Sequence, residues 1–250
     1  MRFYVRFAHE MNGSWYRWGQ QPLAYVQAFR MVASAVHRYA PGNAMLWSPN
    51  YGGGYPFAGG SSNAIPGTAD FFALDTDHDG RLTMSDDMYT PFYPGDSYVD
   101  WVGLTLYWFG QQWPWGENEV PDASRFTGSL TGTYSGPVDE TGVPDFYTAF
   151  AVGHNKPLAI SETAALYNAS NSSGASELSI KSAWMYQVFG PANGKAFPKL
   201  KMVNWFEHEK FEQENYGLID WRATYNPDVV QAFGQHVTAS SGQYLFAPVN

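Results

Sequence analysis

The sequence predicts an α/β fold in which parallel strands alternate with helices. Short apolar runs of strand length recur along the chain, and apolar residues at helical spacing follow most of them. Polar and aromatic residues stand where these runs end. Because the carboxyl ends of parallel barrel strands lie on one face and carry the active site, this arrangement favours a (β/α)8 barrel of the TIM type.

Five apolar runs are expected to be strands, at residues 2–8, 44–48, 98–107, 156–162 and 200–206. Helices are expected at residues 22–39, 144–153, 176–189 and from Pro227 onward, where proline is suited to a first helical turn. One residue rich in chemistry follows or ends each strand: Glu10, Asn50, Tyr107, Glu162 and Trp205. We expect these five side chains on one face of the sheet.

The composition excludes several classes of function. The chain has 250 residues, 44% hydrophobic and 15% charged, which predicts one globular domain over residues 1–250. A formal charge of −9 with only 14 Lys and Arg disfavours nucleic acid, and no apolar run is long enough to span a membrane. Without cysteine there are no disulfides or thiolate metal sites, and no phosphate loop indicates an organic cofactor. A neutral polysaccharide or oligosaccharide is the partner that fits.

Two glutamates at strand ends, Glu10 and Glu162, are the candidate catalytic pair. Glycoside hydrolysis uses two carboxyl groups, one to protonate the leaving oxygen and one to attack the sugar or activate water. Glutamate is seldom placed at the end of an apolar strand without a partner. The alternative is that both are ordinary strand-end glutamates without a catalytic role.

Three segments resemble glycoside hydrolase family 26. They are the run His-Glu-Met-Asn-Gly-x-Trp-x-x-Trp-Gly from His9, the turn Trp47-Ser48-Pro49-Asn50, and the stretch from Tyr93 to Gly103. The resemblance implies a (β/α)8 barrel and a retaining mechanism, with Glu10 as acid/base and Glu162 as nucleophile. That family is best known for endo-β-1,4-mannanases and also includes β-1,3-xylanases and mixed-linkage β-glucanases.

The same resemblance implies roles for four further residues. His9 lies beside the acid/base, Trp15 is a sugar-stacking platform, Tyr107 is a hydrogen-bond partner of the nucleophile, and Trp205 is a floor of the cleaved-sugar subsite. His9 is equally well explained as a structural histidine. The indoles expected to pack the core instead are Trp18, Trp47, Trp101 and Trp184.

The resemblance also implies that the barrel is incomplete. If residues 2–8 correspond to strand four, strands four to eight are present and the first three strand–helix units are not. Two open sheet edges would then favour self-association. A non-catalytic carbohydrate-binding remnant, or a fragment of such an enzyme, is therefore the alternative to a working mannanase.

An insertion at about residues 70–90 has the spacing of an EF-hand calcium loop. Oxygen ligands are expected at its first, third, fifth, seventh, ninth and twelfth positions, with glycine at the sixth. The candidate ligands are Asp75, Asp77, Asp79, the backbone carbonyl of Arg81, Thr83 and Asp86. The sequence therefore predicts a structural Ca²⁺ here, and the alternative is an acidic surface turn.

An extracellular location is expected, on weaker grounds. Asn12, Asn168 and Asn171 each begin an N-glycosylation pattern, which would apply to a secreted chain.

Overall fold

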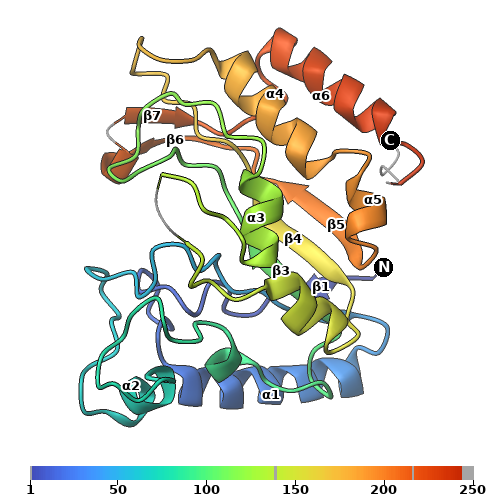
Figure 1. Cartoon of the computed structure of the whole chain (residues 1–250). Helices are drawn as coiled ribbons and strands as arrows, with labels where there is room; N and C mark the ends of the chain where they lie inside the picture. The colour runs from blue at the N-terminus through green and yellow to red at the C-terminus, as the bar shows by residue number, and fades with distance from the viewer. Residues whose placement is uncertain (1, 138–139, 216, 244–250) are drawn as a thin grey trace.

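The main sheet has five parallel strands in the order in which they occur along the chain. The computed structural model describes residues 2–137, 140–215 and 217–243. The strands are β1 (Tyr4–Val5), β2 (Ala44–Trp47), β3 (Trp101–Thr105), β4 (Leu158–Thr163) and β5 (Leu200–Trp205), paired as β1-β2-β3-β4-β5 (Figure 1). The predicted α/β class is confirmed, in the form of five parallel strands that make a half-barrel.

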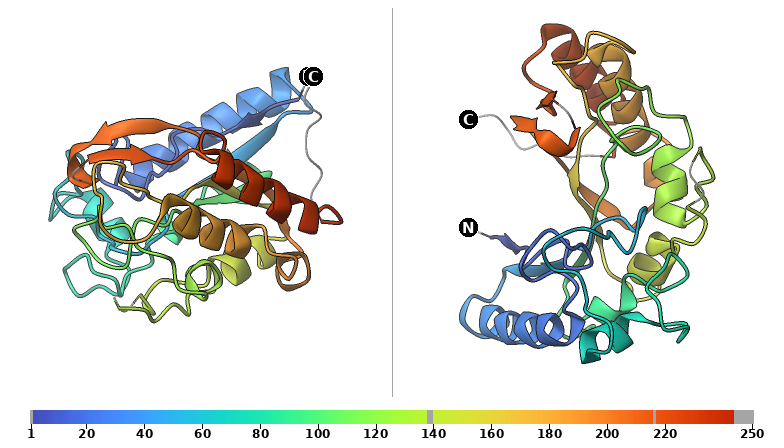
Figure 2. Two further views of the ribbon diagram at one scale, coloured as in Figure 1. Left: turned by 90° about the horizontal axis from the view of Figure 1, so that it is seen from above. Right: turned by 90° about the vertical axis from the view of Figure 1, so that its left-hand side faces the viewer.

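Helices connect these strands along the outer side of the curved sheet, with α1 and α6 at opposite ends (Figure 2). The longer ones are α1 (Pro22–Tyr39), α3 (Arg125–Thr131), α4 (Glu177–Val188) and α6 (Pro227–Ala239). Short ones are α2 (Ala69–Leu74), α5 (Asn193–Ala196), the 3-10 turns η1 (Thr90–Phe92) and η3 (Gln213–Asn215), and the π-helix η2 (Tyr147–Val152).

Helix starts follow from local chemistry. Pro22 and Pro227 occupy first-turn positions, where the missing N–H has no intrahelical partner to lose. The Ser176 side chain accepts the N–H of Ser179 at the start of α4, and the Asn226 side chain accepts that of Asp228 at α6. These features explain why the expected starts of α1, α4 and α6 agree closely with the observed ones, whereas the helix expected over 144–153 is the shorter π-helix η2.

The strand boundaries differ more from the prediction. The expected strand over residues 2–8 is confined to Tyr4–Val5, and the left-handed conformation of Ala8 (φ 44°) and Glu10 (φ 55°) keeps these residues out of the ladder. The expected strand over 98–107 is confined to Trp101–Thr105. The apolar pattern also does not predict the antiparallel hairpin β6 (Glu209–Glu212) and β7 (Gly217–Asp220), whose first strand is largely charged.

One apolar core extends from Met11 to Val229 and includes Trp47 and Trp184, both fully buried. In the described part of the chain, β1 and β5 each pair with one strand, so self-association through these edges stays a prediction. None of the helices described combines the length and the hydrophobicity that a membrane crossing requires.

Tyr89, in the insertion at about residues 70–90, is hydrogen-bonded to the segment after β2. Removing this bond tests its contribution to stability. The Tyr89 ring is fully buried, and its hydroxyl accepts the N–H of Gly52 at 2.8 Å. We predict that Tyr89→Phe lowers the free energy of unfolding by about 1–3 kcal/mol, because a buried amide loses its acceptor. Urea unfolding measures this change.

The exposed side chain of Tyr186 provides the control, and Tyr186→Phe should stay within about 0.5 kcal/mol of the parent. An equal effect of both variants would contradict the proposed anchor.

Candidate functional site

Arg6 organises the carboxyl edge of the sheet. It lies just beyond β1 and forms an ion pair with Oε1 of Glu162 on β4. Its Nε donates to Ser48 Oγ at 3.0 Å, and its second terminal nitrogen donates to Thr105 Oγ1 at 2.6 Å. One guanidinium therefore links the ends of β2, β3 and β4, using the planar fork that suits a carboxylate.

Tyr107 holds the other oxygen of Glu162. It follows β3, and its hydroxyl donates to Glu162 Oε2 at 2.8 Å. Burial, and then the adjacent Glu162 carboxylate, raise the pKa of Tyr107, so this hydroxyl stays protonated and remains a donor. Both oxygens of Glu162 are thus held by fixed donors, which sets the direction in which the carboxylate points.

Glu10 stands in a tight turn beside Glu162. Its N–H donates to the carbonyl of Ser48 at 2.8 Å, which fixes the turn against the end of β2. A left-handed φ of 55° is uncommon for a glutamate, and such strain is concentrated at functional sites. The turn therefore directs the Glu10 carboxyl toward the edge of the sheet where Glu162 lies, and not into solvent.

The Glu10 carboxyl is 9% exposed, and Trp15 Nε1 donates to its Oε2 at 2.8 Å. Burial raises the pKa of Glu10, and the neighbouring Glu162 carboxylate raises it further. The hydrogen bond from Trp15 and the charge of Arg6 act in the opposite direction. The two glutamates therefore differ in environment: Glu10 is buried and favours its proton, and Glu162 is paired with Arg6.

Aromatic rings surround the Glu10 turn. Tyr16 and Trp18 are stacked with their centroids 4.5 Å apart, and Trp15 makes an edge contact with Phe57 at 5.2 Å. Trp15 and Trp18 are 39% and 37% exposed. The prediction that Trp18 packs the core is therefore wrong, because its indole N–H is bound to the carbonyl of His9 while its ring lies on Tyr16 at the surface.

His9 lies on the same rim. Its Nε2 is 3.2 Å from the Tyr16 hydroxyl, and its ring packs beside Trp18. Burial and then Arg6 lower the pKa of His9, so the ring is neutral at neutral pH. A neutral imidazole in hydrogen-bond contact with a tyrosine fits both the structural reading of His9 and contact with a sugar hydroxyl.

Trp205 is placed differently from the other predicted site residues. It ends β5, its Nε1 donates to the carbonyl of Trp221 at 2.8 Å, and its ring stacks on Phe189 at 6.4 Å. It also packs with Tyr107 against a small buried cluster around Trp221. Trp205 is also the β5 partner of Thr163, the residue after Glu162 on β4. Its role as a sugar floor stays a prediction.

Two asparagines that begin glycosylation patterns have structural roles. Asn12 is fully buried, donates to the carbonyl of Asn50 at 2.8 Å and accepts the N–H of Asn50 at 2.8 Å. Asn168 is 3% exposed and bonds to backbone groups of Gly116 and Asn215. Because these amides are inside the fold, the two patterns do not support secretion, and the extracellular location stays a prediction.

The predicted calcium loop brings together three of its candidate ligands. Carboxylate oxygens of Asp75, Asp77 and Asp86 all lie within 4.8 Å of one another. Asp79 accepts the N–H of Arg81 at 2.8 Å, and Thr83 Oγ1 accepts that of Ser85 at 3.1 Å. Ligation by Asp79, by Thr83 and by the Arg81 carbonyl stays a prediction.

Arg6 and Thr105 are site residues that the sequence prediction missed. Arg6 follows the apolar Tyr4–Val5 strand and precedes Phe7, and a charged side chain in such a run requires a partner. Its position four residues before Glu10 is the signal that could have identified it. Thr105 gives no comparable signal, since threonine is common in strands.

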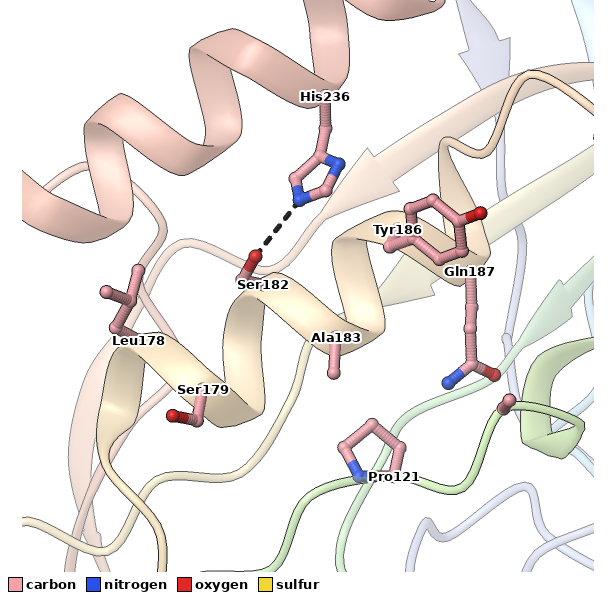
Figure 3. A pocket seen from close by; sticks show the side chains of 9 residues that line it. Pro121, Leu178, Ser179, Ser182, Ala183, Tyr186, Gln187 and His236 are labelled. Atoms are coloured by element: carbon pink, nitrogen blue, oxygen red, sulfur yellow. Dashed lines mark hydrogen bonds between the residues drawn. The ribbon is translucent and has the colours of Figure 1, made fainter.

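A shallow pocket on the helical side of the molecule lacks the carboxyl groups found at the edge of the sheet. It lies between α4, α6 and the segment at Pro121, and Ser182 Oγ is 3.1 Å from His236 Nε2 within it (Figure 3). Its lining contains no carboxylate, so it lacks the pair that glycoside hydrolysis requires.

The titration of Glu10 tests the electrostatics of this site. We predict that its carboxyl titrates above the ordinary glutamate range, and that Glu162→Gln lowers its pKa without restoring the ordinary value. Burial, which the variant leaves in place, is the larger cause, and the like charge is the smaller one. Carbon-13 NMR of the glutamate carboxyls measures both values. An ordinary pKa in the parent, or an increase in the variant, would overturn this account of the site.

Comparison with known proteins gives a structural match and no sequence match. No protein-family model matches the chain, and no curated protein resembles it in sequence.

Solved structures share its fold. The structure of GH26C from Muricauda sp. MAR_2010_75 aligns with a TM-score of 0.53 at 16% identity, over 94% of this chain and 48% of that one. An endo-β-1,4-mannanase double mutant from Cellulomonas fimi gives 0.52 at 18% identity, over 97% and 41%. A modular endo-β-1,4-mannanase from Cellulomonas fimi, described with the glycoside hydrolase family 26 mannanases, gives 0.50 at 18%, over 98% and 45%. The chain therefore spans about half the length of the structures it matches, and over that half it has the fold of glycoside hydrolase family 26 mannanases.

Proposed function

We propose that this chain carries the catalytic pair of a retaining endo-glycoside hydrolase that acts on β-1,4-mannan or a related neutral β-linked polysaccharide. The observation that carries the proposal is the unequal environment of two neighbouring glutamates. Glu10 is buried with a raised pKa, and Glu162 is held by Arg6 and Tyr107. Such enzymes obtain an acid and a nucleophile from two carboxyl groups by giving them surroundings that make their pKa values differ.

In the first step, Glu10 donates its proton to the glycosidic oxygen while Glu162 attacks the anomeric carbon. The C–O bond to the leaving sugar breaks, and a covalent glycosyl ester forms on Glu162. Trp15 Nε1 donates to Oε2 of Glu10 and holds this carboxyl in place beside Glu162. Arg6 and Tyr107 hold Glu162 so that its attack needs no reorientation.

In the second step, Glu10 accepts a proton from water, and that water displaces Glu162 from the anomeric carbon. The same carboxyl thus changes from acid to base, and the anomeric configuration is retained. Loss of charge on Glu162 in the ester lowers the pKa of Glu10, because the like charge that raised it is gone. The pair therefore favours protonated Glu10 before the first step and deprotonated Glu10 before the second.

The surroundings suit a neutral sugar chain. Trp15 and Trp18 expose part of their rings beside Glu10, and flat aromatic faces stack on the apolar faces of pyranose rings. The net charge of −9 disfavours anionic polymers. β-1,3-Xylan and mixed-linkage β-glucan are the alternative substrates, and an extracellular place of action follows from the size of any of these polymers.

A non-catalytic carbohydrate-binding role is the second candidate. The exposed rings of Trp15 and Trp18, the latter stacked on Tyr16, would bind sugar without any turnover. The solved structures are about twice as long as this chain, so the chain matches only part of each of them. Binding without hydrolysis is the result that would favour this role.

Hydrolysis of a substrate panel tests the proposal. We expect reducing-sugar release from mannan, with mixed-linkage glucan and β-1,3-xylan as the comparison substrates. Glu10→Ala should lower the rate by about 10²–10⁴-fold, because general acid catalysis is lost, and Glu162→Ala should abolish release. The exposed Glu214 lies outside the site, so Glu214→Ala is the matched control and should retain the parent rate.

Azide separates the two roles. With an activated aryl glycoside, azide should rescue Glu10→Ala to give a glycosyl azide of retained configuration, and Glu162→Ala to give the inverted one. No release from any polymer by a folded parent, together with binding in affinity electrophoresis, would replace the enzyme with the binding role.

The pH profile provides an independent test. Glu10 must be protonated for the first step, so kcat/KM should fall as pH rises through its raised pKa. Glu10→Ala should lose this alkaline limb on an aryl glycoside whose leaving group needs no proton. A limb that persists in Glu10→Ala would assign the ionisation to another group.

A further inference from the structure

We propose that the loop from Asp75 to Asp86 binds one structural Ca²⁺ through the carboxylates of Asp75, Asp77 and Asp86. This site is separate from the two glutamates and does not depend on the proposed function.

The first observation is the convergence of three carboxylates. An oxygen from each of Asp75, Asp77 and Asp86 lies within 4.8 Å of the other two. Like charges this close repel one another unless a cation lies among them. Proximity of acidic groups is common on surfaces, so this observation alone does not define a site.

The second observation is an unpaired oxygen inside the cluster. Asp75 is 4% exposed, and its Oδ2 accepts the N–H of Gly80 at 3.0 Å. Its Oδ1 is buried and has no hydrogen-bond partner among the described residues. A carboxylate oxygen buried without a donor is costly, because it has lost water and gained nothing in exchange. A bound cation would supply the missing partner.

The donors and the backbone select calcium. All three side chains offer hard oxygen ligands, with no histidine or sulfur in the group. Gly80 has a φ of 82°, the conformation that lets the chain turn sharply at the sixth loop position. Three carboxylates on a turning loop suit the variable coordination of Ca²⁺ better than the strict octahedron of Mg²⁺.

Asp86 differs from the usual last ligand of such loops. It is 1% exposed, and its two oxygens accept N–H groups of Thr76 and Thr83 at 2.7 and 2.8 Å. An aspartate also has a shorter reach than the glutamate normally found there. Asp86 therefore closes the loop on itself and contributes one oxygen to the ion, so that Asp75 and Asp77 are the principal ligands.

The loop leads directly into the core. Met88 and Tyr89 follow it and are fully buried, and the Tyr89 hydroxyl accepts the N–H of Gly52. On the other side, α2 ends at Leu74, also fully buried. An ion that holds the two ends of the loop together would therefore stabilise the fold as a whole, and not only a surface turn.

Calcium titration of the EDTA-stripped chain tests the proposal. Isothermal titration calorimetry should give one Ca²⁺ per chain, and Tm by circular dichroism should rise by roughly 5–10 °C at about 100 times the Kd. Mg²⁺ at the same concentration should give a smaller shift. Asp75→Asn should lose the calcium response. In EGTA it should be at least as stable as the parent, because one repelling charge is gone while the Gly80 contact is kept.

Matched variants make the result decisive. Asp228→Asn removes an exposed carboxylate from the first turn of α6 and should keep the full calcium response. Asp77 is exposed, so Asp77→Asn provides a second ligand variant should Asp75→Asn not fold. No binding by the parent up to about 10 mM calcium, above the weakest range of such loops, would overturn the proposal. So would an unchanged response in both ligand variants, or an equal shift with Mg²⁺.

Discussion

The ion pair between Arg6 and Glu162 is the contact on which the candidate site depends. Arg6 comes from the segment after β1 and Glu162 from β4, 156 residues later in the chain, and the same guanidinium also bonds Ser48 and Thr105 at the ends of β2 and β3. A charge at the edge of an apolar sheet is tolerated when it is paired and fully hydrogen-bonded. The pairing therefore positions a carboxylate and at the same time fixes the relative positions of the ends of β2, β3 and β4.

Much of the fold could be predicted from periodicity, because helices and parallel strands impose their repeats on the sequence. The residues around α1 and α6 carry both the apolar spacing and a starting proline, and Ser176 marks the start of α4, so the starts of these helices were predictable. The short extent of β1 was not, because nothing in the sequence indicates the left-handed conformation of Ala8 and Glu10 beyond it. The hairpin β6–β7 was missed for a different reason: its charged first strand is stabilised by particular partners, such as the bond from Trp221 to Glu212.

The candidate site was predictable at the level of residue type and not at the level of contacts. Glu10 and Glu162 were identified by their place after apolar runs, whereas Arg6 became visible only when its partner did. Trp18 shows the limit most clearly: it lies three residues after Trp15 in the same motif, and its stack on Tyr16 at the surface is a contact that the sequence does not reveal. Which face an indole presents depends on the turn at Glu10, and that turn is fixed by a long-range bond to Ser48.

The polar contacts on the side of β2 connect the loop from Asp75 to Asp86 to the Glu10 turn. Tyr89, just after the loop, accepts the N–H of Gly52, and the adjoining Asn50 exchanges two hydrogen bonds with Asn12, two residues after Glu10. The bond to Gly52 is buried and the two bonds between Asn50 and Asn12 are partly buried, and a buried amide that loses its partner costs more than the bond itself contributes. The turn that presents Glu10 therefore rests on the insertion through a series of obligatory pairings. Such an arrangement gives a strained backbone at Glu10 the support that strain of this kind requires.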